Sequence, residues 1–454
     1  MQSYNNKSMY GHGWSVGRDR MMRRPACLGA FVVTLSCLMS MSPTVTADVV
    51  PGDVIDSSNW QKAEGLLPEP VLNWVKRGEF ILDIGELDVE DPTKIRSDYV
   101  LEAFETNRGK YAIDAEGGVV EKASGKLATF VVGFPFTVLD PEDPVVVEKL
   151  MYNHLYGQHV NGFFKFRFQL IWVAESGFER EVDCVWQGAS LTGYPEAKKI
   201  RNPSGVEKYS IMVVRKPYDL AGTAIMTHRF FAPTQADNTF GYIPAIRRVR
   251  RMSAANRSDA FIGSDECVDD VNGYDGKVPA FDWKLLRVQE ALIAMLPGVY
   301  PFVQNRYGEW ETTKDVKRVI YGYEKEGWQG APWAPTNLVW VKRPVYVIEM
   351  TPKDRYYNYG VHYIWASPET YACPFKVVND RAGEYWKSLY MINTFVQSAD
   401  KRMAVIAVPG QNVIDERYKH ATVTQILNPD NPWTMKARLN LDDFSMAGFQ
   451  KFCK

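Results

Sequence analysis

The chain has 454 residues, of which 46% are hydrophobic and 13% aromatic, and its 53 basic and 54 acidic side chains leave a net charge of −1. This composition excludes a disordered chain, because it supplies enough apolar surface to offset the entropy of an unfolded polymer. The near-zero charge also argues against a nucleic-acid-binding protein, which normally carries a large basic excess.

Residues 1–47 are typical of an N-terminal extension followed by a secretory signal peptide. Arg23 and Arg24 precede an apolar stretch over residues 26–41, and Val45 and Ala47 put small residues at the −3 and −1 positions of a cleavage site. The apolar stretch is shorter than the roughly 20 residues that span a bilayer. We therefore expect export with cleavage after Ala47, and an uncleaved anchor is the alternative.

Residues 48–160 are predicted to form a largely helical N-terminal part that precedes the sheet, which we call the lead-in. Helices are expected over residues 70–76 and 94–107, because each apolar run ends close to a glycine. A third is expected to begin at Asp143-Pro144 and to reach Gly157, since aspartate caps helices and proline fits their first turn.

Residues 161–454 are predicted to form a β-sheet body that makes one continuous domain with the lead-in. Phenylalanines alternate with charged side chains from residue 163 onward, which is the period of a strand. Similar runs recur over residues 181–187, 208–216, 223–231, 339–350, 360–366, 402–408 and 422–427. Many strands with short breaks favour a large antiparallel sheet. A helix over residues 283–296, closed by Pro297-Gly298, is expected to interrupt them, and residues 327–335 are expected to form a loop.

The predicted strands are rich in aromatic side chains. Such side chains either fill an ordinary core or line a cavity for an apolar ligand on the concave face of a curved sheet, and alternation cannot separate the two. The candidates for a hydrophobic lining are Phe164, Phe166, Phe168, Trp172, Trp340, Tyr346, Tyr363 and Trp365.

Searches for catalytic and metal-binding motifs give negative results. The sequence contains no H-E-x-x-H, G-x-S-x-G, phosphate-loop or dinucleotide-binding pattern. We therefore predict no catalytic residues, no metal and no cofactor, while an enzyme without a recognised motif is kept as an alternative. Export would permit disulfides, and the cysteines beyond residue 47 could pair in three ways: Cys184, Cys267, Cys373 and Cys453.

An arginine-rich run is followed by an acidic segment. Extended backbone would put the guanidinium groups of Arg247, Arg248, Arg250 and Arg251 on both faces of a strand. Groups that point inward need carboxylate partners, and Asp265, Asp269 and Asp270 follow within about twenty residues. The first interpretation is an ion-pair lattice in which Arg248 or Arg250 is buried opposite Asp269 or Asp270. The second is a rim that recognises an anion such as a lipid phosphate or carboxylate.

The segment from Pro217 to Asp270, which contains the arginine run and the acidic residues, resembles the domain-of-unknown-function family 1329 (DUF1329). It also resembles the wider set of outer-membrane lipoprotein-sorting (LolA/LolB-like) proteins. Further similarity at residues 133–136, 143–144, 343–349 and 379–387 extends the resemblance over most of the chain. Cys267 departs from the pattern and puts the geometry of the acidic loop in doubt. The family positions in the segment are Pro217, Asp219, Gly222, Thr223, Tyr242, Pro244, Arg247, Arg248, Arg250, Arg251, Gly263, Ser264, Asp265, Asp269 and Asp270.

The resemblance implies a mainly β (α+β) fold, with a large curved antiparallel sheet or incomplete β-barrel of LolA/LolB type and a few covering helices. It also implies a hydrophobic cavity and a periplasmic or outer-membrane-associated location. The expected function is a carrier or binding protein for a lipid-like or hydrophobic ligand in the bacterial envelope. The alternative is a non-carrying adaptor subunit of an envelope transporter of the resistance-nodulation-division type. The expected partners are thus a hydrophobic small molecule or lipid and an envelope transporter or outer-membrane protein.

Overall fold

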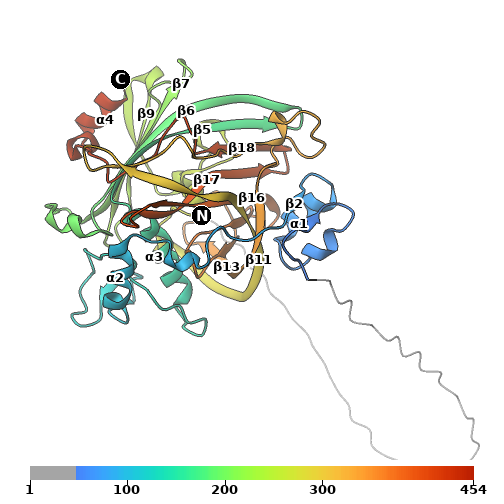
Figure 1. Cartoon of the computed structure of the whole chain (residues 1–454). Coiled ribbons are helices and arrows are strands. Elements are labelled where there is room, and N and C mark those ends of the chain that lie inside the picture. Colours follow the sequence, from blue (N-terminus) through green and yellow to red (C-terminus); the bar gives the residue numbers. More distant parts are fainter. Residues whose placement is uncertain (1–47, 454) are drawn as a thin grey trace, which may run out of the picture. The chain divides into compact units, whose positions relative to one another are not determined.

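The computed structural model describes residues 48–453, so the predicted signal peptide lies outside the described residues. A large sheet dominates the fold (Figure 1). It has 15 strands in the spatial order β10-β9-β8-β7-β6-β5-β18-β17-β16-β15-β14-β13-β11-β12-β19. The prediction of a mainly β fold with a large antiparallel sheet and few helices is confirmed. The strands are β5 (Phe163–Ala174), β6 (Gly177–Ser190), β7 (Val206–Lys216), β8 (Ala224–Phe230), β9 (Asn238–Ile243), β10 (Arg248–Met252), β11 (Phe281–Gln304), β12 (Trp310–Thr312), β13 (Val339–Pro352), β14 (His362–Ala366), β15 (Phe375–Asn379), β16 (Tyr385–Ser398), β17 (Ala404–Asp415), β18 (His420–Gln425) and β19 (Thr434–Met435).

Strand β5 shows why the sequence folds this way. Its phenylalanines at 164, 166 and 168 are buried, whereas Lys165 and Arg167 between them are exposed. The alternation therefore places one face of the strand against the core and the other in solvent. The predicted strands correspond to β5, β6, β7, β8, β13, β14, β17 and β18, with ends that differ by up to several residues.

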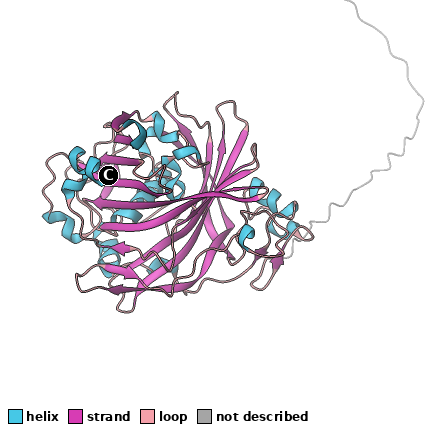
Figure 2. Cartoon of the chain, turned by 90° about the horizontal axis from the view of Figure 1, so that it is seen from above, coloured by secondary structure: helices cyan, strands magenta, loops and turns pink. Residues whose placement is uncertain are grey.

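The sheet closes on itself through two additional strand pairings. β19 pairs with both β12 and β5, and the second half of β11 pairs in parallel with β16. A continuous path of paired strands thus runs through β5, β18, β17, β16, β11, β12 and β19 and back to β5. Figure 2 shows the helices placed around these strands.

The helix predicted over residues 283–296 is wrong, because this segment belongs to the long strand β11. Its residues favour helices intrinsically, but residues 281–295 pair with β13 from Phe281↔Pro352 to Met295↔Val339. Residues 291–296 are buried in the sheet, and tertiary pairing of this kind outweighs local preference. Pro297-Gly298 does not end a helix. The register between β11 and β16 shifts at these residues, and β11, which pairs with β13 up to Met295, pairs with β16 from Val299 onward.

In the described part of the chain, four α-helices accompany the sheet: α1 (Glu69–Lys76), α2 (Asp98–Asn107), α3 (Val146–His159) and α4 (Met446–Phe452). The first three confirm the predicted helices with shifted ends. Asp143 does not cap α3 directly, since its carboxylate accepts a hydrogen bond from the Val145 N–H, and the helix begins one residue later. Two small pairs, β1 (Val54–Ile55) with β2 (Leu82–Asp83) and β3 (Tyr111–Ile113) with β4 (Val119–Glu121), complete the lead-in. None of the described helices is long and apolar enough to cross a membrane.

Residues 253–280, between β10 and β11, form a segment without strands that we call the covering loop. It packs on one face of the sheet: the Asp265 N–H donates to the Thr422 hydroxyl of β18 at 2.9 Å, and Asp275 accepts from Lys208 of β7. Helix α3 lies against the same region, because His154 lies 3.0 Å from the carbonyl oxygen of Tyr274 in the covering loop. The covering loop and α3 therefore enclose space against the sheet.

Candidate functional site

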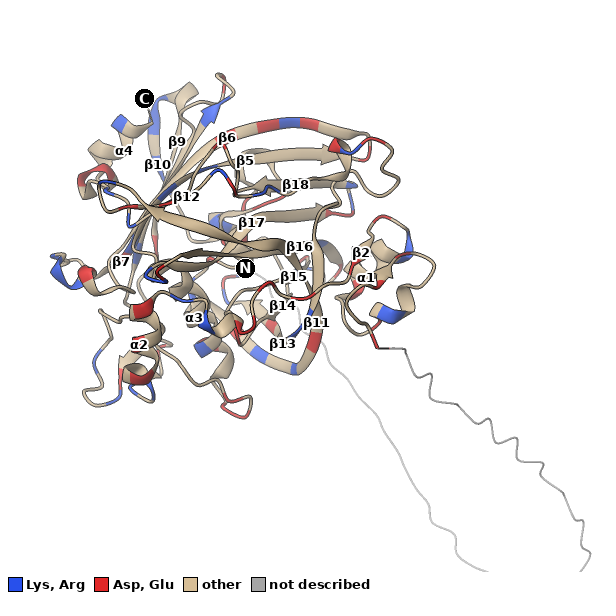
Figure 3. Cartoon of the chain, in the orientation of Figure 1, with Lys and Arg blue, Asp and Glu red and all other residues tan. Residues whose placement is uncertain are grey.

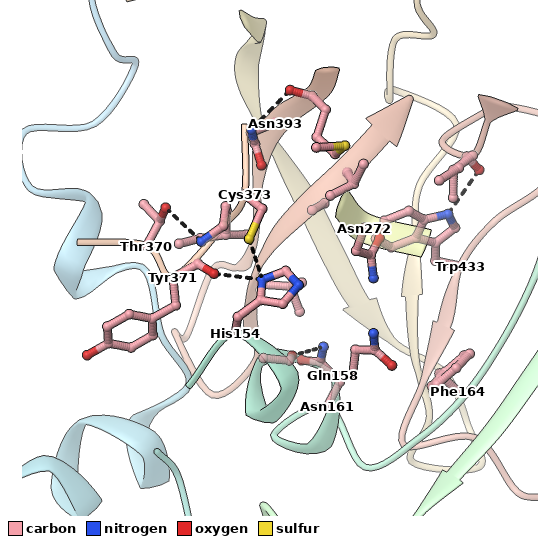
Figure 4. Close-up of a pocket in the computed structure, with 18 of the residues that line it drawn as sticks. His154, Gln158, Asn161, Phe164, Asn272, Thr370, Tyr371, Cys373, Asn393 and Trp433 are labelled. Carbon is pink, nitrogen blue, oxygen red and sulfur yellow. Dashed lines mark hydrogen bonds between the residues drawn. The ribbon is translucent and has the colours of Figure 1, made fainter. Parts of the chain in front are cut away.

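Two adjoining cavities lie between the sheet, α3 and the covering loop. The first has a volume of about 120 Å3 and the second about 70 Å3. Figure 4 shows the first, with side chains of α3, β5 and β16 directed toward it. Four side chains line both cavities and separate them: Phe166, Trp186, Asn272 and Ile426.

Three of the eight predicted lining residues reach these cavities. Phe164 lines the first, Phe168 the second, and Phe166 both. The sequence interpretation missed Trp186 of β6 and Trp433, which lines the first cavity from the segment before β19. Trp186 could have been found, because it is an aromatic residue of the predicted strand over residues 181–187, whereas Trp433 lies outside every predicted strand.

The other five candidates lie elsewhere in the structure. Trp340 stacks on Phe375 in the main core, and Trp365 meets the same ring edge-on. The Trp172 indole donates to the Gly263 carbonyl. Tyr346 is buried in a second core cluster, and Tyr363 is partly buried against the main core. None of these five lines either cavity.

A histidine and a cysteine meet in the first cavity, but they do not form an activated pair. The Cys373 sulfur lies 3.5 Å from Nδ1 of His154. Both ring nitrogens of His154 also face carbonyl oxygens, those of Tyr371 at 2.8 Å and Tyr274 at 3.0 Å. Burial lowers the pKa of His154 and raises that of Cys373 to about 12, so the thiol stays protonated. The pair therefore packs the cavity wall.

The second cavity contains a buried carboxyl group, Glu266, on a largely apolar wall. Its side chain accepts a hydrogen bond from the Thr424 hydroxyl at 2.5 Å, and it forms no ion pair with any residue of the described chain. Burial raises the pKa of Glu266 to about 8, and the carboxylates of Asp270 and Asp265 contribute to the rise. At neutral pH the side chain is therefore mostly protonated and can donate a hydrogen bond.

Asp270 of the covering loop is buried and pairs with basic residues that are far away in the sequence. Asp270 accepts from Lys376 Nζ of β15 at 2.7 Å and from the Tyr359 hydroxyl at 2.6 Å, and Lys387 Nζ lies 3.8 Å away. Burial alone would raise the pKa of Asp270, but the two lysines outweigh it and hold the pKa below its ordinary value. The cluster thus braces the covering loop against β15 and β16. The Cys267 N–H also donates to Asp270, so the cysteine fits the loop.

Asp269 and Asp265 have other partners. Asp269 accepts from Nε of Arg257 at 2.6 Å, within the covering loop. Asp265 accepts from Nδ1 of His420 at 2.7 Å and from the Thr422 hydroxyl at 2.8 Å. The three acidic family positions within the covering loop therefore hold it in place, and none of them pairs with the arginine run.

The predicted ion-pair lattice between the arginine run and the acidic segment is wrong. Arg247, Arg248, Arg250 and Arg251 are exposed, and none forms an ion pair within residues 48–453. The run is not one continuous strand: β9 ends at Ile243, a turn follows, and Arg247 has a φ of 48° before β10 begins. Because β10 is the outermost strand of the sheet, its side chains reach water and need no carboxylate partner.

Three other family positions, Tyr242, Pro244 and Gly222, shape the corner of the sheet next to the arginine run. Tyr242 is buried opposite Val249, and Pro244 begins the turn between β9 and β10. Gly222 has a φ of 89°, and a Cβ there would lie 2.4 Å from the Cys453 carbonyl oxygen and 3.3 Å from Pro244. A side chain is therefore excluded at position 222, where two turns and the C-terminal helix meet.

The four cysteines of the described chain, Cys184, Cys267, Cys373 and Cys453, are buried free thiols. A larger hollow of about 330 Å3 lies beside Arg257 and Lys277. Its buried charges are already paired, since Arg257 meets Asp269 and Asp275, and three backbone carbonyls accept from Lys277. Within residues 48–453, no group of three metal-ligating side chains could hold a metal ion.

Comparisons with known proteins give one family and several similar structures. An outer-membrane lipoprotein-sorting protein domain from Vibrio parahaemolyticus is 15% identical, with a TM-score of 0.44, over 66% of this chain and 97% of that one. A DUF1329 family protein from Desulfovibrio piger is 14% identical, with a TM-score of 0.42, over 66% and 98%. A LolA superfamily protein from Nitrosomonas europaea is 12% identical, with a TM-score of 0.36, over 64% and 96%.

A search of curated proteins finds no match. The family described as "Protein of unknown function (DUF1329)" matches residues 54–450, which include the arginine run, the covering loop and both cavities. The chain therefore belongs to the DUF1329 family.

Proposed function

We propose that this protein binds a small amphiphilic molecule, with the apolar part in the two cavities and the polar end at Glu266. In the cell it would act as a periplasmic carrier or binding protein for a hydrophobic ligand of the bacterial envelope. The observation that carries the proposal is the buried carboxyl group of Glu266, which has no ion-pair partner within residues 48–453, on a largely apolar wall. Release of water from apolar surface would drive binding, at roughly 25 cal/mol per Å2.

The cavity volumes restrict the apolar part of the ligand. An apolar cavity of about 150 Å3 in another protein holds benzene, so the first cavity, at about 120 Å3, suits a ring or a short alkyl chain. Sites for larger ligands usually measure about 300–1,000 Å3. A long acyl chain would fit only after Phe166 and Trp186, which separate the cavities, rotate away. We therefore expect a compact apolar group.

The polar end of the ligand is restricted by the groups on the wall of the second cavity. A protonated Glu266 donates a hydrogen bond, so the matching ligand group is an acceptor such as a carboxylate or an ester carbonyl. Lys208 lies on the same wall, but its ammonium already donates to Asp275 at 2.6 Å and to Gln158 at 3.0 Å. The charge of Lys208 is thus neutralised within the protein, which leaves Glu266 as the anchor.

Calorimetric titration with hexanoic acid and methyl hexanoate, at about pH 6 and about pH 10, tests the anchor. Binding of hexanoate should weaken strongly at the higher pH, because an ionised Glu266 then repels the ligand carboxylate. The affinity for the uncharged ester should fall less than the affinity for hexanoate. Glu266→Gln keeps an N–H donor and should make hexanoate binding independent of pH over this range.

Native mass spectrometry of the protein purified from its own host tests binding itself. The wild-type protein should carry a small molecule, and Ile426→Trp, which fills both cavities, should lose it. Val288→Trp adds the same side chain at an exposed position of β11 and should retain the ligand. A wild-type protein that carries nothing and binds neither probe would contradict the proposal and favour the adaptor role in an envelope transporter.

A further inference from the structure

Four exposed arginines lie at one edge of the sheet, and the proposed ligand site gives them no role. We call Arg247, Arg248, Arg250 and Arg251 the arginine edge; they lie on β10 and the turn before it, beside β9 (Figure 3). Within residues 48–453, their one side-chain hydrogen bond is from Arg251 to Asn238 at 2.5 Å. Guanidinium groups without carboxylate partners make a local positive field in a chain whose total charge is −1.

Apolar side chains project next to the arginine edge. Ile243 and Ile246, at the turn between β9 and β10, are 50% and 41% exposed, and Tyr218 is 97% exposed in the turn between β7 and β8. The two turns lie at the same end of the sheet, because Ala224 pairs with Tyr242 and a Cβ on Gly222 would contact Pro244.

Asp219, in the same turn as Tyr218, contributes one exposed negative charge, whereas the neighbouring arginine edge contributes four positive charges. The corner therefore combines excess positive charge with exposed aliphatic and aromatic side chains. This combination is typical of surfaces that enter the head-group region of a membrane, where the arginines meet phosphates and the apolar groups reach the acyl chains.

Arg250, and Arg248 two residues before it, lie on the same face of the sheet as the second cavity. Directly paired residues point to the same side, and the pairing runs Trp186↔Met212, Met212↔Ile225, Ile225↔Gly241 and Gly241↔Arg250. The first three residues of this row line the second cavity. Arg250 is thus two strands from the cavity wall, roughly 10 Å at the usual strand spacing.

We propose that the arginine edge, with Tyr218, Ile243 and Ile246, docks this protein on an anionic lipid bilayer. Arginine forms paired hydrogen bonds with phosphate, and the exposed apolar side chains would enter the interface beside it. Docking through this edge brings the second cavity close to a source of an amphiphilic ligand, because Arg250 is two strands from the cavity wall. The docking itself needs no ligand, so it can be tested separately from the function proposed above.

A simpler role for the arginines is protection of the sheet edge. Charged side chains on an outermost strand prevent another chain from adding to it. That role predicts aggregation when the arginines are removed and no affinity for lipid. It does not require exposed Ile243, Ile246 and Tyr218 beside them, since apolar groups at an edge favour association.

Sedimentation with lipid vesicles separates these possibilities. The purified protein is mixed with vesicles of phosphatidylglycerol and phosphatidylcholine in equal parts, or of phosphatidylcholine alone, at low and high salt. One variant replaces the four arginines by glutamine, and another carries Tyr218→Ser, Ile243→Ser and Ile246→Ser. A control removes four exposed basic residues elsewhere by substitution with glutamine: Lys284, Arg287, Lys314 and Lys317.

The wild-type protein should bind the anionic vesicles at low salt, and high salt should weaken binding. Removing the four arginines should weaken it by at least about tenfold, the serine variant should also lose affinity, and the control should bind like wild type. Circular dichroism melts check that all variants fold. Equal binding to both vesicle types, unchanged binding of the arginine variant, or a wild-type protein that ignores vesicles and binds an acidic protein would each overturn the proposal.

Discussion

Residues 247–251 and residues 265–275 follow one another in the sequence and carry opposite charges, but the structure places them in different environments. Arg248 and Arg250 face solvent on the outermost strand, whereas Asp269 and Asp270 are almost fully buried against the sheet. The carboxylates pair with Arg257 and with Lys376. The difference follows from the cost of burial: a buried charge must have a partner, while a charge at a strand edge is solvated by water.

Among the substitutions that test this difference, Asp270→Ala should have the largest effect on stability. It leaves Lys376, whose side chain is fully buried, without its carboxylate, and we expect the free energy of unfolding to fall by about 3–5 kcal/mol. Denaturant unfolding measures it. Asp219→Ala removes an exposed carboxylate of the same family motif and should change stability by less than about 0.5 kcal/mol.

The ion pair between Asp270 and Lys376 can also be removed by replacing both residues. Adding Lys376→Met to Asp270→Ala takes away the orphaned ammonium, so the double variant should recover part of the lost stability. A single variant as stable as wild type, or a double variant that loses the sum of both single effects, would show that the covering loop is not held by this pair.

The next test concerns Glu266, a buried acid of the covering loop that has no cationic partner. Its pKa rises from 4.5 to about 8 on folding, so between these pH values the unfolded chain loses a proton that the folded protein keeps. Stability should therefore fall as the pH rises from about 4 to about 8. The upper limit is about 5 kcal/mol, and relaxation around the charge should reduce it to about 2 kcal/mol.

Glu266→Gln removes this titration. Compared with wild type, the variant should be equally stable near pH 4 to within about 1 kcal/mol and more stable near pH 9. Unfolding with urea at both pH values provides the measurement. If the difference between the two proteins stays constant over the whole range, Glu266 does not bind its proton more tightly in the folded state, and the anchor proposed for the ligand is lost as well.

The sequence predicts the sheet well where one face is buried and the other solvated. Strand β5 is the clear case, since its phenylalanines and its charged residues alternate over a single strand. It fails at β11, where helix-favouring residues form a strand because β13 pairs with them. Local preference cannot reveal a partner that lies some fifty residues away along the chain.

The candidate site is less predictable than the sheet. Phe164, Phe166 and Phe168 reach the cavities, but Trp340 and Trp365 show the same alternation and pack in the core. Alternation reports which face of a strand is apolar, not whether that face meets a cavity. The partners of the acidic segment were missed for a similar reason: Lys376 is 106 residues from Asp270, and its charge is brought there only by the order of strands in the sheet.

The smallest expected effect completes the comparison. Because Arg248 and Arg250 are exposed and form no ion pair within residues 48–453, Arg248→Ala or Arg250→Ala should change the free energy of unfolding by less than about 0.5 kcal/mol. Denaturant unfolding in the same buffer as for Asp270→Ala gives a direct contrast. A loss of several kcal/mol would mean that these arginines pair with the covering loop after all, and it would remove the free positive charge on which membrane docking depends.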